Sequence, residues 1–217
     1  MRKILPYYLR AARAFTLVEL LVVMVVLGVL IGLLLSGISS VRARSNSATC
    51  LFNLRQVASA GILYAEENNG GLPVSSYNRQ ANGMMEYLKY DINYVGKTVL
   101  TCPSLQKKYP TRAHHYRTTS INLVATQGHS KSRKNLRAFP TLSRTIFFLD
   151  GLLNPGASSG NVYNYHFGAL NEQQFEDRFQ FLHGNLCHVV YLDGHAKGLS
   201  PEELLDWDTQ SILWRGE

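Results

Sequence analysis

The segment AFTLVE at residues 14–19 opens an apolar run that reaches Leu35 and contains a single charged residue, Glu19. An apolar run of about 20 residues is long enough to cross a bilayer as a helix. A carboxylate near the edge of such a helix costs roughly 2–4 kcal/mol unless it finds a partner. The run therefore requires an apolar environment, and Glu19 is a functional residue by hypothesis.

A short basic segment lies on the N-terminal side of this run. Its cations are Arg2, Lys3, Arg10 and Arg13. Together with residues 14–19, they resemble the class III prepilin signal of bacterial type IV pilin-like proteins. The resemblance implies that a prepilin peptidase cuts between Ala14 and Phe15 and then methylates the new N-terminus at Phe15. The chain departs from the usual pattern at Ala14, where Gly is commoner in the family.

An ordinary secretory signal is the alternative interpretation of the same segment. Such a signal has its small-residue cleavage site after the apolar run, and SGISS at residues 36–40 would fit that position. Glu19 argues against it, because nothing in a secretory signal requires a carboxylate there. We therefore expect the apolar helix to remain on the mature protein as a membrane anchor and filament core.

Most of the positive charge belongs to the N-terminal segment. The chain has 22 Lys and Arg against 15 Asp and Glu, and loss of residues 1–14 would leave 18 against 15, a net charge of +3. Positive residues in such a leader keep it cytoplasmic. The stretch 92–149 contains ten Lys or Arg and no Asp or Glu. We interpret it as solvated loops balanced by acidic segments; the alternative is a basic surface that contacts a polyanion or an acidic neighbour. Nucleic acid is not an expected partner.

The helical pattern continues well beyond the apolar run. Apolar and small residues recur at spacings of three and four from Cys50 to Ala65, and no proline occurs between Pro6 and Pro73. NGG at residues 69–71 is a stop signal. A helix over residues 15–68 would be about 80 Å long. Gly28 and Gly32 lie four residues apart on one face, where small residues allow close helix packing.

The last third of the chain has the pattern of strands. We expect strands at 144–149, 186–192 and 195–199, followed by a short helix that begins after Ser200. The fold class is therefore α+β, with a long N-terminal helix packed on a small antiparallel head, as in pilins. The expected divisions are a leader at 1–14, a transmembrane half of the helix at 15–40, an amphipathic half at 41–70 and a globular head at 71–217.

Three cysteines occur, and an exported head would permit a disulfide among them. The resemblance implies Cys50–Cys102, because related sequences often carry a Cys near each position. Cys187 is expected to be a small buried hydrophobic residue in a strand. The alternative is that all three remain thiols.

A second resemblance lies near the C-terminus. His183, Asp193 and Gly194 match the H-x9-DG segment of one group of prepilin-like proteins. Within a hairpin, however, His183 and Asp193 would lie at opposite ends of a strand. Asp193 and His195 flank one turn and are better neighbours. Asp150 ends a strand that looks parallel to the strand before Asp193, so it could join them.

The acidic residues of this region leave three interpretations open. The first is a structural Asp-Gly turn at Asp193, with Gly194 in a positive-φ conformation and the histidines as polar surface groups. The second is a structural Ca2+ site that uses Asp150 and Asp193, since related major pseudopilins bind calcium in a C-terminal loop. The third is a catalytic metal site, for which the usual ligand spacings are missing. Apart from that Ca2+, no cofactor is expected.

The resemblance as a whole implies a filament subunit rather than an enzyme, most similar to a type II secretion pseudopilin. Expected partners are the prepilin peptidase, the inner-membrane assembly platform, membrane lipid before assembly, and a filament of the same chain and other pseudopilins. In that filament Glu19 would pair with the amine of Phe15 on a neighbouring subunit. The head would be periplasmic or, after assembly, extracellular. The alternatives are a type IV pilus pilin for adhesion, motility or DNA uptake, and a membrane-anchored metal-dependent hydrolase or binding protein.

Overall fold

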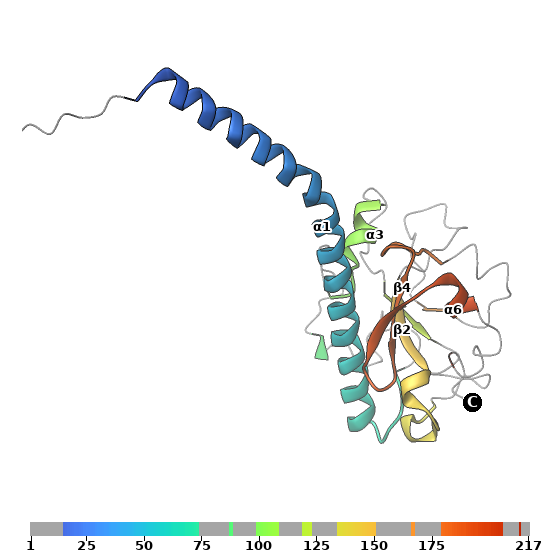
Figure 1. Cartoon of the computed structure of the whole chain (residues 1–217). Helices are drawn as coiled ribbons and strands as arrows, with labels where there is room; N and C mark the ends of the chain where they lie inside the picture. Colours follow the sequence, from blue (N-terminus) through green and yellow to red (C-terminus); the bar gives the residue numbers. More distant parts are fainter. Residues whose placement is uncertain are drawn as a thin grey trace, which may run out of the picture. The chain divides into compact units, whose positions relative to one another are not determined.

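Helix α1 (Leu17–Glu67) accounts for 51 residues and is the longest element of the fold (Figure 1). The computed structural model describes residues 15–73, 87–88, 99–108, 119–122, 134–150, 166–167, 179–205 and 213. The expected helix is confirmed within two residues at each end. It stops where Asn69 and Gly70 take positive φ angles of 56° and 85°, and the Gly70 amide donates to the carbonyl of Ala65.

The chain divides into two compact units within α1. The first reaches Arg42, and the second, here called the head unit, comprises Ala43–Glu217. The C-terminal part of α1 therefore belongs to the head unit.

The head unit contains a five-stranded sheet in the order β3-β1-β2-β4-β5. Its strands are β1 (Thr119–Asn122), β2 (Ile146–Asp150), β3 (His166–Phe167), β4 (Cys187–Tyr191) and β5 (Ala196–Leu199). Antiparallel pairing joins β1, β2, β4 and β5, while the short edge strand β3 runs parallel to β1. The strands expected at 144–149, 186–192 and 195–199 are thus confirmed, and β1 and β3 are additional.

One expectation about these strands is wrong. The ends of β2 and β4 looked parallel in sequence, but the two strands pair antiparallel, with Leu149 opposite Val189. Asp150 therefore lies beside the start of β4, whereas Asp193 follows its end. The hairpin considered above for His183 would pair residues 176–182 with β4, but β2 and β5 occupy both edges of that strand, so this hairpin is not formed.

The helix and the sheet share the main apolar core. Leu54, Val57 and Ala65 of α1 are fully buried in a cluster with Phe147 and Phe148 of β2. Gly61 permits this contact, because a Cβ at that position would lie 2.6 Å from Cζ of Phe147. A second cluster, which includes Ile146, Val189 and Leu204, forms around the alternate residues of the same strands.

Short helical segments complete the described part of the head. They are α3 (Pro103–Lys108), the 3-10 segments η1 (Leu136–Ala138) and η2 (Leu142–Arg144), and α6 (Pro201–Leu205). The expected cap of α6 is present, because the amide of Glu203 donates to the Ser200 hydroxyl and the amide of Ser200 donates to the Glu203 carboxylate.

Candidate functional site

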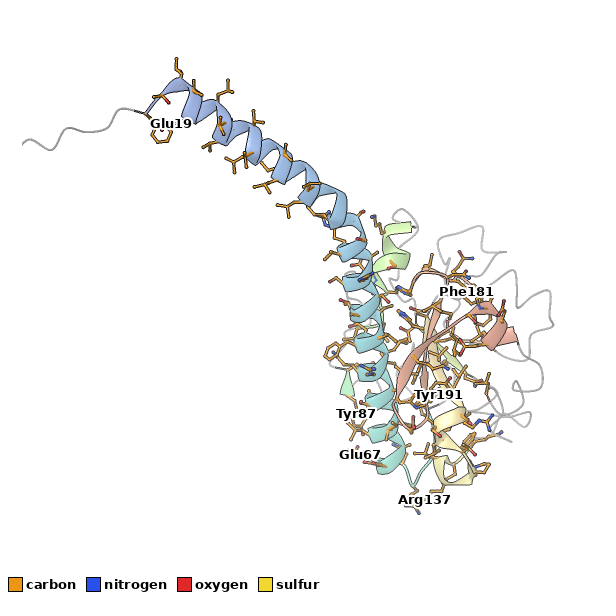
Figure 2. All side chains as sticks on the ribbon, in the orientation of Figure 1. Glu19, Glu67, Tyr87, Arg137, Phe181 and Tyr191 are labelled. Atoms are coloured by element: carbon orange, nitrogen blue, oxygen red, sulfur yellow. The ribbon has the colours of Figure 1, made fainter. Side chains whose placement is uncertain are left out.

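Glu19 lies in the first turn of α1, where its carboxylate is bound by Thr16 (Figure 2). The amide and the hydroxyl of Thr16 donate to Oε2 of Glu19 at 2.9 and 2.8 Å, and the Glu19 amide donates to the Thr16 hydroxyl at 3.2 Å. This reciprocal pattern is a capping box. Glu19 thus has a local role at the start of the helix, and its side chain is exposed beside Phe15.

The apolar side chains that follow Glu19 project outward along the helix. Between Leu17 and Leu35 every large hydrophobic side chain is exposed, from 47% at Val23 and Leu27 to 85% at Leu17. The helix is long and apolar enough to cross a membrane, with a mean hydropathy of 3.0 in its most apolar window. A surface of this size requires lipid or other helices around it.

A second group of polar side chains lies inside the head unit, around Asp150, and it includes the buried His183, so the expectation of surface histidines is wrong for this residue. This carboxylate ends β2 and is 1% exposed. Its Oδ2 is 2.9 Å from Nε2 of His183 in the turn before β4, and the Cys50 thiol of α1 donates to the same oxygen at 2.9 Å. His188 of β4 is also buried, and its Nδ1 lies 3.5 Å from Oδ2. We call Cys50, Asp150, His183 and His188 the Asp150 cluster.

Neighbouring groups fix the positions of this cluster. The His188 amide donates to Oδ1 of Asp150 at 2.9 Å, since the two residues are neighbours across β2 and β4. Nε2 of His188 is 3.1 Å from the Ser47 hydroxyl, whereas its buried Nδ1 has no hydrogen-bond partner among the described residues. The imidazole rings of His183 and His188 are stacked, with centroids 3.9 Å apart.

The cluster shifts the pKa values of its members. Burial alone would raise the pKa of Asp150, but the hydrogen bond from His183 and the close imidazole ring of His188 outweigh it and hold that pKa well below its usual range. Burial alone would lower the pKa of His183, yet its bonds to Asp150 and Cys102 raise it to about 9.

The two neighbouring thiols shift in opposite directions. Burial raises the pKa of Cys50. The hydrogen bond with Cys50, helped by His183, lowers the pKa of Cys102 to about 6. The described geometry therefore favours a carboxylate and an imidazolium side by side, next to a neutral Cys50 thiol and a more acidic Cys102 thiol.

Residues 9–35 match the family model described as the prokaryotic N-terminal methylation motif. The chain carries a prepilin-type signal. This motif supports a type IV pilin-like or pseudopilin protein, and it implies processing by a prepilin peptidase and assembly into a filament. No curated protein and no solved structure shows significant similarity to the chain.

The methylation motif covers the predicted processing and assembly residues of this pilin-like chain. Ala14 lies outside the described residues, and Phe15 directly precedes the Thr16–Glu19 cap. Cleavage, methylation and the pairing of Glu19 with a Phe15 amine remain predictions. Added Cβ atoms at Gly28 and Gly32 would meet nothing within 4 Å, so the small-residue face is open to a neighbouring helix.

The structure does not bring the H-x9-DG residues into one site. His183 joins the Asp150 cluster, while Asp193 accepts hydrogen bonds from the amide of His195 at 3.0 Å and lies 2.6 Å from its Nδ1. The expected turn is confirmed, with Gly194 at φ 88°. Asp150 and Asp193 lie at opposite ends of β4, roughly 15 Å apart at 3.3 Å per residue. The predicted cation site from these two carboxylates is therefore not formed.

The cysteines occupy two different surroundings. All three are buried thiols, and no disulfide joins them in the structure. Cys102 lies beside Cys50, and its Sγ is 3.3 Å from Nε2 of His183, so the predicted Cys50–Cys102 disulfide has its partners adjacent and stays a prediction. Cys187 is fully buried, as expected, and its thiol donates to the backbone carbonyl of Asp150 at 3.2 Å.

Sequence reasoning missed two members of the Asp150 cluster. Cys50 was considered only as a disulfide partner, and His188 only as a strand residue. A signal for both was available at Asp150, because a carboxylate that continues the buried strand IFFL needs polar partners in the interior. Antiparallel pairing of β2 and β4 then identifies His188 as the nearest one.

Proposed function

We propose that this chain is a pseudopilin-type subunit of a type II secretion filament. The observation that supports it most is Glu19, the one charge in an apolar run, up to Leu35, that lies within the methylation motif. The proposed role is structural assembly and not catalysis. The proposed location is the inner membrane, with a single spanning helix and the head on the periplasmic side.

Assembly would depend on a new partner for Glu19. Within the single chain its carboxylate is bound by Thr16, and in the filament it would pair with the Phe15 amine of a neighbouring subunit. Removal of residues 1–14 creates a positively charged amine at Phe15, and methylation preserves that charge. In a filament core the amine and the Glu19 carboxylate of a neighbouring subunit would each be costly alone, and their pairing offsets that cost. A subunit in the wrong axial register would leave a charge unpaired, so the same pair would reject it.

The processing step is tested by intact-mass and N-terminal analysis of the mature protein from its native membrane. We expect a chain that begins at N-methylated Phe15. A chain that still begins at Met1, or one cut within residues 36–40, would contradict the proposal.

The assembly step is tested with Glu19→Leu. This variant should still insert in the membrane, because it removes the only charge of the apolar run. It should fail to form filaments, because the Phe15 amine loses its partner. Normal filaments from this variant would refute the register role.

A type IV pilus pilin is the second candidate, since the methylation motif is common to both kinds of filament. Shearing the cells separates the two. Long surface filaments that contain this chain indicate a pilus, whereas a chain that remains with the cell envelope supports a secretion pseudopilin.

A further inference from the structure

The Asp150 cluster holds four potential metal ligands in one buried place. One ligand atom from each residue lies within 4.8 Å of every other. All four residues are buried, and His183 is the most exposed of them at 8%. We propose that the cluster is a structural zinc site, with Cys50 Sγ, Asp150 Oδ2, His183 Nε2 and His188 Nδ1 as its ligands.

Hydrogen bonds within the protein leave this cluster incompletely satisfied. The Cys50 thiol and His183 Nε2 both approach Oδ2 of Asp150 at 2.9 Å. His188 Nδ1 is left at 3.5 Å from that oxygen and makes no hydrogen bond within the part of the chain that the structure describes. A buried polar atom without a partner costs about 1–3 kcal/mol. A cation between these atoms gives Nδ1 a partner and accounts for its position.

The chemistry of the donors selects zinc. A thiolate, a carboxylate and two imidazoles form a mixed sulfur, oxygen and nitrogen set, which suits Zn2+, whereas Ca2+ takes oxygen ligands only. The charges also balance, since one thiolate and one carboxylate neutralise a divalent ion and both imidazoles bind as neutral rings. Binding therefore displaces the thiol proton of Cys50 and one proton of His183.

The distances are close to those of a tetrahedral site. Zinc bond lengths place neighbouring ligand atoms about 3.3–3.7 Å apart. The contacts to Oδ2 of Asp150 are 2.9, 2.9 and 3.5 Å, so these three pairs need to separate only slightly. The other pairs of ligand atoms lie within 4.8 Å and have to adjust as well. The rings of His183 and His188 are stacked at an interplanar angle of 8°. At least one ring must turn out of that stack to direct its lone pair at the ion.

Outer contacts already orient the proposed ligands. The Ser47 hydroxyl is 3.1 Å from Nε2 of His188, and the Ser104 hydroxyl is 3.5 Å from Nδ1 of His183. Such contacts to the second ring nitrogen fix which nitrogen faces a metal. Four protein ligands in a buried place also leave no open position for substrate, so the site is structural. It would link α1 to β2 and β4 within the head unit.

Joint oxidation of Cys50 and the adjacent Cys102, by exchange with an external disulfide that is reduced to two thiols, is the competing fate of this cluster. A disulfide between them would remove one proposed ligand, and Asp150 and His183 would remain as an ion pair. Zinc binding and this disulfide therefore exclude each other on the same chain.

The test uses the full chain in detergent, reduced and freed of metal, and titrated with Co2+ and then with Zn2+. We expect one equivalent of Co2+ to bind with the visible bands of a tetrahedral site and a thiolate charge-transfer band, and Zn2+ to displace it. Cys50→Ser should lose the charge-transfer band. His188→Gln should weaken binding by at least about tenfold. The control His195→Gln, an exposed residue of the same hairpin, should bind Co2+ as the parent does.

Three results would overturn the proposal. The first is a parent chain that gives no tetrahedral cobalt spectrum, a result that does not depend on whether any variant folds. The second is equal Co2+ binding by the parent and by His188→Gln. The third is protein isolated from cells without reductant that contains the Cys50–Cys102 disulfide and no zinc.

Discussion

Oδ2 of Asp150 lies 2.9 Å from Nε2 of His183, and the two side chains are only 2% and 1% exposed. A buried ion pair of this kind adds little over two apolar residues, because both charges lose their hydration. Removal of one partner is strongly destabilising, because the remaining charge stays buried without compensation. The stability of the head unit therefore depends on both partners together.

Asp150→Asn should lower the free energy of unfolding of the metal-free protein by about 3–5 kcal/mol. The matched control is Asp193→Asn. The Asp193 side chain is 34% exposed and forms an ion pair with the exposed His195, so the expected loss is about 0–1 kcal/mol. Urea unfolding of the full chain in detergent with a chelator, followed by the fluorescence of its two tryptophans, measures both values. Equal losses of unfolding free energy in the two variants would show that burial of the ion pair does not increase the cost of removing its carboxylate.

The shifted pKa values of His183 and Cys102 give opposite pH dependences. The pKa of His183 is raised from 6.5 to about 9, so its contribution to stability is complete below pH 6.5 and is lost as pH rises through 9. The pKa of Cys102 is lowered from 9.0 to about 6, so its contribution is complete above pH 9 and is lost as pH falls through 6. Between these limits the two effects oppose each other.

Cys102→Ser should therefore reveal a pH dependence that the parent chain conceals. In the metal-free, reduced parent we expect nearly constant stability between pH 6.5 and 9, whereas that of Cys102→Ser should fall as pH rises. Asp150 adds no slope in this range, because its lowered pKa lies far below it. Urea unfolding at several pH values provides the measurement. If the free energy of unfolding of Cys102→Ser does not change with pH in this range, the raised pKa of His183 is contradicted.

Local patterns were enough to predict the elements that carry their own signals. Helix α1 follows from its proline-free apolar pattern and from the stop at Asn69 and Gly70. The hairpin of β4 and β5 follows from apolar alternation on either side of an Asp-Gly turn. In each case the residues that determine the element are neighbours in sequence, so the helix and the hairpin can be predicted without knowledge of the tertiary fold.

The Asp150 cluster could not be predicted in the same way, because its members come from four separate segments. Cys50 meets Asp150 across 100 residues, and His183 meets it across 33. Their meeting depends on the antiparallel pairing of β2 with β4, and the two strands end in such similar sequences that they looked parallel. The side-chain chemistry was visible in the sequence, but the geometry that combines it was not.

Gly61→Val should destabilise the head unit through the packing of α1 on the sheet. A Cβ at residue 61 would lie 2.6 Å from Cζ of Phe147, whose ring is fully buried, so the ring and its neighbours in the core would have to shift. Overpacking of this kind costs about 1–3 kcal/mol. Ser59→Val is the control, because residue 59 is exposed on the same helix and carries the same β-branched penalty. If urea unfolding gives both variants the same free energy of unfolding, the close approach of residue 61 to Phe147 does not restrict the side chain at that position.

The local and the intersubunit roles of Glu19 can be separated by two substitutions at the start of α1. Glu19→Gln retains a side chain that completes the capping box with Thr16 but removes the charge that would pair with the Phe15 amine. Thr16→Ala removes the hydroxyl of the cap and keeps the charge. If the register depends on the ion pair, Glu19→Gln should abolish filaments while Thr16→Ala still forms them, as judged by electron microscopy of sheared material and by crosslinking. Filaments from Glu19→Gln together with none from Thr16→Ala would instead assign the residue to the helix cap, since a cap needs an acceptor and not a charge.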